Sequence, residues 1–286
     1  MENKKGVLFV NPGSGKGGPT VEELTSAARA LDVRVHVLEE GDDLAELARQ
    51  VDEEVLGMAG GDGSLGAVAQ VAIERDLPFV CIPWGTRNHF ALDVGLDADD
   101  PLAALAAFRE GVERRIDVGR VAEQVFLNNV SLGVYALLVH RRERRRQRGE
   151  TLARLRALLI SLKDRRRTER FVVAGQPLRA SVVLVANNEY RLDLFSIGER
   201  DRLDEGTLAV YAAHGLRRLR WTERKKTSVR IETRSTPARV AIDGEPALLD
   251  SPLELRVEPR ALRLLVPAGK EVKTGAAAAS TSLEDE

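Results

Sequence analysis

The sequence predicts an N-terminal α/β domain with a parallel sheet, followed by a C-terminal domain rich in antiparallel strands. In residues 1–111, short apolar runs alternate with stretches in which apolar residues recur every three or four positions. After about Val112, short β-type runs follow one another with turns between them. One helical insertion, at about 136–168, interrupts these runs. The alternation in the first part and its absence in the second predict two domains.

The strands of the first domain are expected at four short apolar runs, with helices between them. The strand positions are 7–10, 33–38, 54–59 and 78–83, and the helix positions are 20–31, 42–51 and 64–76. This order is typical of βαβ units, in which helices cover both faces of a parallel sheet. We therefore assign residues 1–111 to an α/β nucleotide-binding domain.

The second domain, residues 112–269, is expected to be built from runs rich in Val, Leu and Ile. These runs lie at 126–139, 171–175, 179–188, 206–213, 228–233, 238–243, 253–258 and 261–267. Short strands that are separated by turns are typical of antiparallel sheets. Residues 270–286 are mostly small and polar, so we expect a disordered tail there.

Composition limits the classes of partner and location. The 286 residues are 43% hydrophobic and carry a net charge of −1, so the overall charge does not indicate a nucleic-acid partner and none is expected. The single cysteine, Cys81, excludes a disulfide within the chain and is expected to be an inert core residue. Signal-peptide features are missing, and every apolar run falls short of the ~20 residues that span a bilayer. We therefore expect a soluble, cytoplasmic protein.

The glycine loop after the first strand, "NPGSGKGGPT", resembles two phosphate-binding patterns. The P-loop pattern G-x-x-x-x-G-K-[ST] fails twice, because Lys16 is followed by glycine and position 10 is valine. The dinucleotide pattern G-x-G-x-x-G fits better, and Glu39 or Glu40 follows at about the expected distance. Its matching positions are Gly13, Gly15 and Gly18. A dinucleotide site and a flexible surface loop both remain open from this loop alone.

The second loop, "MAGGDGS", follows the third expected strand and contains an aspartate, Asp62, among glycines. Glycines let backbone N–H groups approach a phosphate, and the N-terminus of the next helix favours negative charge. A carboxylate beside a phosphate is repelled unless a cation or a transferable proton lies between them. The loop therefore indicates Mg²⁺-assisted phosphoryl transfer rather than hydride transfer. The alternative is that Asp62 only caps a helix that begins at Ser64.

The third loop, "PWGTRNHF", follows the fourth expected strand and offers Gly85, Thr86 and Asn88. The junctions after the first, third and fourth expected strands thus contain glycine and polar side chains. In open α/β sheets, ligands bind at the carboxyl ends of the strands, where these junctions meet. The coincidence of three such loops predicts a ligand site at this edge.

Together with "AIDGEP" at 241–246, the three loops resemble the diacylglycerol kinase catalytic-domain family, which includes bacterial lipid kinases and the sphingosine and ceramide kinases. The motifs occur in the family's order over nearly the whole chain. The resemblance implies an α/β nucleotide domain, a β-sandwich-like second domain and an active site in the cleft between them. It also implies transfer of the γ-phosphate of ATP to a hydroxyl of diacylglycerol or a related lipid. The alternatives are a soluble-substrate kinase of the NAD-kinase type, which shares GGDG, and a non-catalytic lipid- or nucleotide-binding relative.

The resemblance implies roles for single residues. Glu245 is expected to accept the proton of the substrate hydroxyl, while Asp243 and Asp62 organise Mg²⁺ and the transferred phosphate. Glu205, in "DRLDEGTLAVY", stands where the family usually has a metal-binding aspartate. The residues expected to bind ATP are Asn11, Ser14, Gly15, Gly60, Gly61, Asp62, Gly63, Ser64, Gly85, Thr86 and Asn88. Without the other motifs, "IDGEP" would indicate only a hairpin turn.

The segment 139–170 is rich in arginine, with leucines at helical spacing. It predicts a basic amphipathic helix that lies on anionic lipid headgroups, so we expect peripheral contact with an anionic membrane. The alternatives are a helix packed on the second domain with a solvated basic face, and RNA binding, for which stacking aromatics are scarce. A homodimer is left open.

Overall fold

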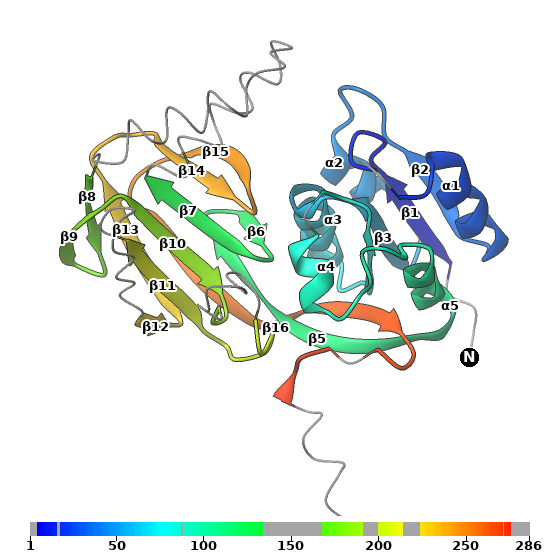
Figure 1. Cartoon of the computed structure of the whole chain (residues 1–286). Helices are drawn as coiled ribbons and strands as arrows, with labels where there is room; N and C mark the ends of the chain where they lie inside the picture. Colours follow the sequence, from blue (N-terminus) through cyan, green and yellow to red (C-terminus); the bar gives the residue numbers. More distant parts are fainter. Residues whose placement is uncertain are drawn as a thin grey trace, which may run out of the picture. The chain divides into compact units, whose positions relative to one another are not determined.

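The computed structural model describes residues 5–15, 18–86, 88–133, 136, 168–190, 200–213, 224–270 and 272–275. The chain divides into two compact units. The first unit comprises residues 1–118, 190–205 and 259–286, and the second comprises residues 119–189 and 206–258. Figure 1 labels the helices and most of the parallel strands of the first unit, and the antiparallel strands of the second.

The first unit is built on a parallel sheet, as the sequence predicts. Its strands are β1 (Gly6–Val10), β2 (Arg34–Val37), β3 (Val55–Gly60) and β4 (Phe79–Pro83), in the order β2-β1-β3-β4. Each neighbouring pair is parallel. The end of β16 (Leu253–Pro267) lies parallel to β4, with Leu264 opposite Phe79. Every residue of β1, β3 and β4 is buried, as expected for a sheet that is covered on both faces.

The helices of the first unit follow the expected strand–helix alternation. They are α1 (Val21–Ala30), α2 (Leu44–Gln50), α3 (Asp62–Glu74), α4 (His89–Asp93) and α5 (Ala107–Glu110), with a 3-10 turn η1 (Ala103–Ala106) before α5. Thr20 begins α1 with a capping box, because its hydroxyl accepts from the Glu23 N–H and the Glu23 carboxylate accepts from the Thr20 N–H. No helix of the described residues is long and apolar enough to cross a membrane.

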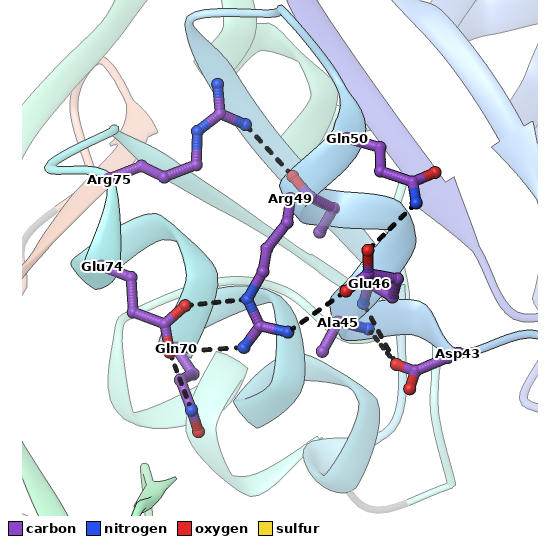
Figure 2. A network of polar contacts seen from close by, with 9 residues as sticks. Asp43, Ala45, Glu46, Arg49, Gln50, Gln70, Glu74 and Arg75 are labelled. Carbon is purple, nitrogen blue, oxygen red and sulfur yellow. Dashed lines mark hydrogen bonds and ion pairs between the residues drawn. The ribbon is translucent and has the colours of Figure 1, made fainter.

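A polar network joins α2 to α3 (Figure 2). Arg49 of α2 donates to the carboxylate of Glu74 at the end of α3, with Nε–Oε2 at 3.1 Å. Gln70 donates to the same carboxylate at 2.9 Å. Arg75, directly after α3, donates to the carbonyl oxygens of Ala48 in α2 and of Val51 just after it. The network therefore fixes the C-terminal end of the helix whose first residues form the second glycine loop.

Helix α3 begins earlier than the sequence predicts. The expected start was Ser64, but the helix starts at Asp62, and Gly61 is its N-cap. The N–H groups of Ser64 and Leu65 both donate to the carbonyl oxygen of Gly61, so the glycines form the first turn. Buried residues farther along α3 anchor the helix in the core and offset the low helix propensity of glycine. Asp62 is thus a first-turn residue and not the N-cap.

The second unit contains antiparallel strands in two sheets. One sheet has the order β12-β11-β10-β7-β14-β15, and the other contains β16, β13, β8 and β9 in this order, with β5 and β6 attached. The strands are β5 (Gly111–Val121), β6 (Gln124–Phe126), β7 (Asn129–Gly133), β8 (Glu169–Val173), β9 (Gln176–Ala180), β10 (Val182–Asn187), β11 (Leu208–Ala213), β12 (Arg224–Lys226), β13 (Ser228–Thr233), β14 (Ala238–Ile242) and β15 (Glu245–Leu249). One buried apolar cluster includes Leu132 and Val185 from the first of these sheets and Ile231 and Leu255 from the second.

The compact units differ from the expected domain ranges of 1–111, 112–269 and 270–286. Residues 190–205 belong to the first unit, and β5 and β16 each contribute residues to both units. The physical reason is a set of contacts between distant stretches, such as the hydrogen bond from the Leu203 N–H to the Lys273 carbonyl. Within the expected disordered tail, Val272 is buried and the Gly275 N–H donates to Asp204. Of the expected basic helix at 139–170, residues 139–167 lie outside the described residues, while Glu169 and Arg170 belong to strand β8 and so are not helical.

Candidate active site

The loops after β1, β3 and β4 begin side by side at the carboxyl edge of the parallel sheet. The register places Val10 opposite Ala59, and Gly60 opposite Pro83. The sequence predicts this arrangement, because parallel strands bring their C-terminal ends to one edge. Three further contacts join the loops to one another.

The first contact is made by Asn11, which joins the first loop to the second. Its Nδ2 donates to the hydroxyl oxygen of Ser64 at 3.2 Å. Its Oδ1 accepts from the Gly13 N–H at 3.0 Å, which closes a turn within the first loop. Ser14 is placed by a backbone bond to the Asn11 carbonyl at 3.0 Å. Because a hydroxyl that accepts one bond still has a proton to donate, Ser64 can bind a phosphate oxygen while it contacts Asn11.

The second contact joins the first loop to the third through Trp84. This residue follows β4, is 3% exposed, and donates from Nε1 to the Pro19 carbonyl at 3.0 Å. A Cβ on Gly15 would overlap the indole ring, so the first loop lies directly against Trp84 and only glycine fits there. Sequence reasoning did not single out Trp84, although it directly precedes Gly85 in the third motif.

The third contact is a backbone approach between Gly85 and Gly61. A Cβ on Gly85 would lie 2.7 Å from the Cα of Gly61 and 2.8 Å from Oδ1 of Asn88. Asn88 has a positive φ of 51° and is 5% exposed. Its Oδ1 accepts from the Gly85 N–H at 2.7 Å, and its Nδ2 donates to the Gly85 carbonyl at 3.0 Å. Asn88 therefore closes the third loop from inside, while Thr86 is exposed on it.

Asp62 belongs to the second loop, where it begins α3, and is half-buried. Its Oδ1 accepts from the backbone N–H of Phe90, in the first turn of α4, at 3.2 Å. Burial raises the pKa of the Cys81 thiol well above its ordinary value, and the negative charge of Asp62 raises it further. Cys81 is thus a protonated core residue, as its apolar neighbours in the sequence predict. Around Gly61, by contrast, no atom of the described residues lies within 4 Å of the Cβ position, so these residues leave the space beside the second loop open.

Asp243 and Glu245 belong to the second unit, in the hairpin β14–β15. Asp243 and Gly244 have φ values of 47° and 85° between paired residues Ile242 and Glu245, as in a two-residue turn with positive φ at both positions. The hairpin turn that this motif indicates by itself is therefore present. Glu245, the first residue of β15, is exposed.

The carboxylate of Asp243 accepts three backbone hydrogen bonds, two from the loop between β6 and β7 and one from the first residue of β7. The donors are the N–H groups of Leu127 at 2.7 Å, Asn128 at 2.8 Å and Asn129 at 2.9 Å. The Asp243 N–H in turn donates to the Asn129 carbonyl. Sequence reasoning missed this bracing role, because its partners lie more than a hundred residues earlier in the chain.

Glu205 is half-buried and belongs to the same unit as Asp62, although the sequence placed it in the second domain. Its neighbour Asp204 accepts from the Gly275 N–H and from Arg202, so this segment is anchored in the first unit. In the described part of the chain, no three His, Cys, Asp or Glu side chains are grouped closely enough to hold a metal ion. A Mg²⁺ site in a phosphotransferase is commonly completed by one or two carboxylates and the substrate phosphates, and the single carboxylate of Asp62 in its glycine loop fits such a site.

The comparison with known families agrees with this geometry. Residues 5–121 match the model of the diacylglycerol kinase catalytic domain. This part of the chain is therefore similar to the catalytic domain of diacylglycerol kinases. The match covers the parallel sheet and all three glycine loops, and it ends at the last residue of β5.

Curated proteins that resemble parts of this chain carry the names of lipid kinases. The chain is 32% identical over 131 residues to "Probable lipid kinase YegS-like" of Chromohalobacter salexigens, which covers 43% of this chain and 42% of the relative. It is 30% identical over 133 residues to the protein of the same name in Klebsiella pneumoniae, with 44% of each covered. The match thus spans less than half the length of these relatives. A diacylglycerol kinase of Bacillus subtilis is 38% identical over 72 residues, 24% of each chain.

Solved structures support the fold over the whole chain. A diacylglycerol kinase structure from Bacillus anthracis aligns with a TM-score of 0.68 and 20% sequence identity, covering 94% of this chain and 98% of that one. The family fold, an α/β unit with a parallel sheet and an antiparallel β unit, is therefore the fold of this chain, as predicted.

Proposed function

We propose that the protein is an ATP-dependent lipid kinase that transfers the γ-phosphate of ATP to a hydroxyl of diacylglycerol or a related lipid. The observation that supports it most strongly is the contact among three glycine loops at one sheet edge, one of which contains the Asp62 carboxylate. The match of residues 5–121 to the model of the diacylglycerol kinase catalytic domain supports the same reaction class.

In this proposal the triphosphate of ATP lies against the second loop. The N–H groups of Gly61 and Gly63 stand at the start of α3, a helix of 13 residues whose N-terminus favours negative charge. The open space at the Gly61 Cβ position leaves room for a phosphate. The hydroxyl of Ser14 and the backbone of Gly15, in the first loop, would also contact the triphosphate. The hydrogen bond between Asn11 and Ser64 holds the first and second loops together.

Asp62 would hold a Mg²⁺ ion against the phosphate oxygens. When bound, this ion neutralises the charge that develops on the transferred phosphoryl group. The Phe90 N–H fixes one carboxylate oxygen of Asp62, so the second oxygen is held in a defined direction. Glu205 is the proposed ligand of a further Mg²⁺.

Glu245 is the proposed general base. An exposed carboxylate at the start of a strand can approach an incoming hydroxyl without a rearrangement of the hairpin. Asp243 lies two positions before Glu245, in the turn of the same hairpin. Its hydrogen bonds with the backbone of residues 127–129 hold the hairpin, and with it Glu245, in place. We also propose a cytoplasmic protein whose segment 139–170 makes peripheral contact with an anionic membrane, because that segment is strongly basic.

The substrate class can be tested by the transfer of label from [γ-³²P]ATP to a panel of acceptors. The panel contains diacylglycerol, ceramide and sphingosine in mixed micelles, and NAD in solution. The proposal predicts that label enters the lipid phase. Label on NAD alone would establish the soluble-substrate alternative, and ATP binding without transfer to any acceptor would establish a non-catalytic relative.

A further inference from the structure

We propose that Asp93 and Arg200 are positioning residues, and that their buried ion pair holds α4 where its first turn orients the carboxylate of Asp62. The inference rests on the proposed function in one respect, the assignment of Asp62 to phosphoryl transfer. Neither residue belongs to a glycine loop. All the residues involved belong to the first unit.

The N-terminal end of α4 contacts Asp62 directly. The first N–H groups of a helix have no partner within the helix and are usually satisfied by an N-cap side chain. In α4 the N-cap residue is Asn88, whose side chain is bonded to Gly85 instead. The Phe90 N–H donates to Oδ1 of Asp62, a residue of a different loop. The direction of the Asp62 carboxylate therefore depends on where the first turn of α4 lies.

The C-terminal end of α4 is fixed by a buried ion pair. Asp93, its last residue, is 2% exposed, and Arg200 is 0% exposed. Arg200 Nε donates to Oδ2 of Asp93 at 2.7 Å, and the Arg200 N–H donates to Oδ1 at 3.1 Å. A carboxylate at a helix C-terminus opposes the helix dipole, and burying two charges costs desolvation. The ion pair is therefore not explained by a gain in helix stability. Its two hydrogen bonds to the Asp93 carboxylate instead fix the position of Asp93.

Arg200 is itself held by contacts with distant parts of the chain. Its carbonyl accepts from Lys273 Nζ at 2.9 Å, and its backbone forms a bridge with Tyr190. Leu203, three residues later, donates to the Lys273 carbonyl and accepts from the Asp117 N–H. The segment that begins at Arg200 is thus a fixed support, and Asp93 is tied to it.

Helix α4 has only five residues, so it cannot be stable without tertiary contacts. The two ends of the helix are tied to Asp62 and to Arg200. Releasing the C-terminal end should let the helix shift or fray, and the Phe90 N–H should then lose its constant contact with Asp62. Through this connection, the ion pair acts on the proposed active site without touching a substrate.

The test compares Asp93→Asn, which removes the charge at constant size, with Arg200→Lys and with the double variant Asp93→Asn/Arg200→Met. The double variant removes both buried charges, so neither is left unpaired. The matched control is Glu113→Gln, which breaks the two-point pair with Arg263 (2.8 and 3.0 Å) in the same unit. Cooperative urea unfolding selects the variants that are folded.

The first readout is the change in the ¹⁵N–¹H signal of Phe90 when Asp62 is replaced by Asn, measured at one constant pH in the protein without nucleotide. We call this change the Phe90 response. It should be large in the wild-type background, because the Phe90 N–H there loses a charged acceptor. The Asp93 and Arg200 variants should lose most of the Phe90 response, and Glu113→Gln should retain it. The second readout is phosphoryl transfer, for which we expect kcat to fall about 10-fold or more while KM for ATP changes little.

The two readouts separate this inference from the proposed function. An unchanged Phe90 response in the double variant would overturn the inference, whatever the activity. A lost response with unchanged kcat would overturn the positioning role in catalysis. If the wild type transfers no phosphate, the proposed function fails, while the Phe90 response still decides whether the ion pair orients Asp62.

Discussion

The carboxylate of Asp243 belongs to a kinase-like motif, but it forms hydrogen bonds with the backbone of its own unit. Its oxygens accept three backbone N–H bonds from Leu127, Asn128 and Asn129. Bonds of N–H groups to a carboxylate are stronger than those between neutral groups. Stability is therefore one role of Asp243, and it can be measured separately from activity.

We expect Asp243→Ala to lower the free energy of unfolding by about 2–4 kcal/mol, because three N–H groups lose a charged acceptor. Asp243→Asn, which keeps one acceptor oxygen, should lose less. Urea denaturation of both variants measures the difference. An alanine variant as stable as the wild type would show that the brace is unimportant.

Glu245 should behave in the opposite way, since it is exposed and begins an edge strand. We expect Glu245→Gln to lower kcat by ~10²–10⁴-fold with ATP affinity and stability little changed, as for loss of a general base. Steady-state kinetics and ATP titration measure the two effects. Glu254→Gln, at another exposed glutamate of the second unit, is the control. A loss confined to ATP binding would instead assign Glu245 to positioning of the nucleotide.

At the scale of the elements, the close approach of the second and third loops predicts a difference between two glycines. A Cβ on Gly85 would lie 2.7 Å from the backbone of Gly61, whereas a Cβ on Gly61 would meet nothing within 4 Å. We expect Gly85→Ala to lower both stability and ATP affinity, and Gly61→Ala to lower ATP affinity alone. Thermal unfolding and ATP titration of the two variants test this. Unchanged ATP affinity in Gly61→Ala would mean that no phosphate occupies the space beside that residue.

Strands β5 and β16 are linked by an ion pair that predicts a pH dependence of stability. Hydrogen bonds from Arg120, at 2.7 and 3.0 Å, hold the pKa of the Glu258 carboxyl below its ordinary value. Because this pKa is lower in the folded state, the pair stabilises the fold above the ordinary glutamate pKa of about 4.3. The contribution is lost as the pH falls through the lowered value. Glu258→Gln should therefore flatten the acid side of a stability–pH curve from urea denaturation, and a curve parallel to that of the wild type would contradict this.

The elements of the first unit could be predicted from the sequence because their signals are local. An apolar run, a glycine loop and a helical period lie within about 25 residues of one another in each βα unit.

The start of α3 at Asp62 was missed, because packing of the helix overrides the low propensity of glycine. Strand β5 was missed because its first residues, Gly111–Arg115, are mostly charged and exposed. The expected strands 253–258 and 261–267 are one strand, β16, which continues through Pro259 and Arg260.

At the scale of the whole molecule, the candidate site could be predicted only in part. The loops and Asp62 follow from motifs, since each motif is continuous in the sequence. The support of α4 by Arg200 could not be predicted, because Asp93 and Arg200 are 107 positions apart and neither belongs to a motif. For the same reason the sequence assigned residues 190–205 to the second domain, whereas they belong to the first unit.

The most direct test of the whole account is phosphoryl transfer by Asp62→Asn compared with the wild type. The substitution keeps the size of the side chain and an oxygen that can accept from Phe90, so the fold should be retained. It removes the charge that would hold Mg²⁺ against the phosphates. With [γ-³²P]ATP, Mg²⁺ and the preferred lipid, we predict labelled lipid from the wild type and none above background from the folded variant. Equal rates of lipid labelling by the two proteins would contradict it.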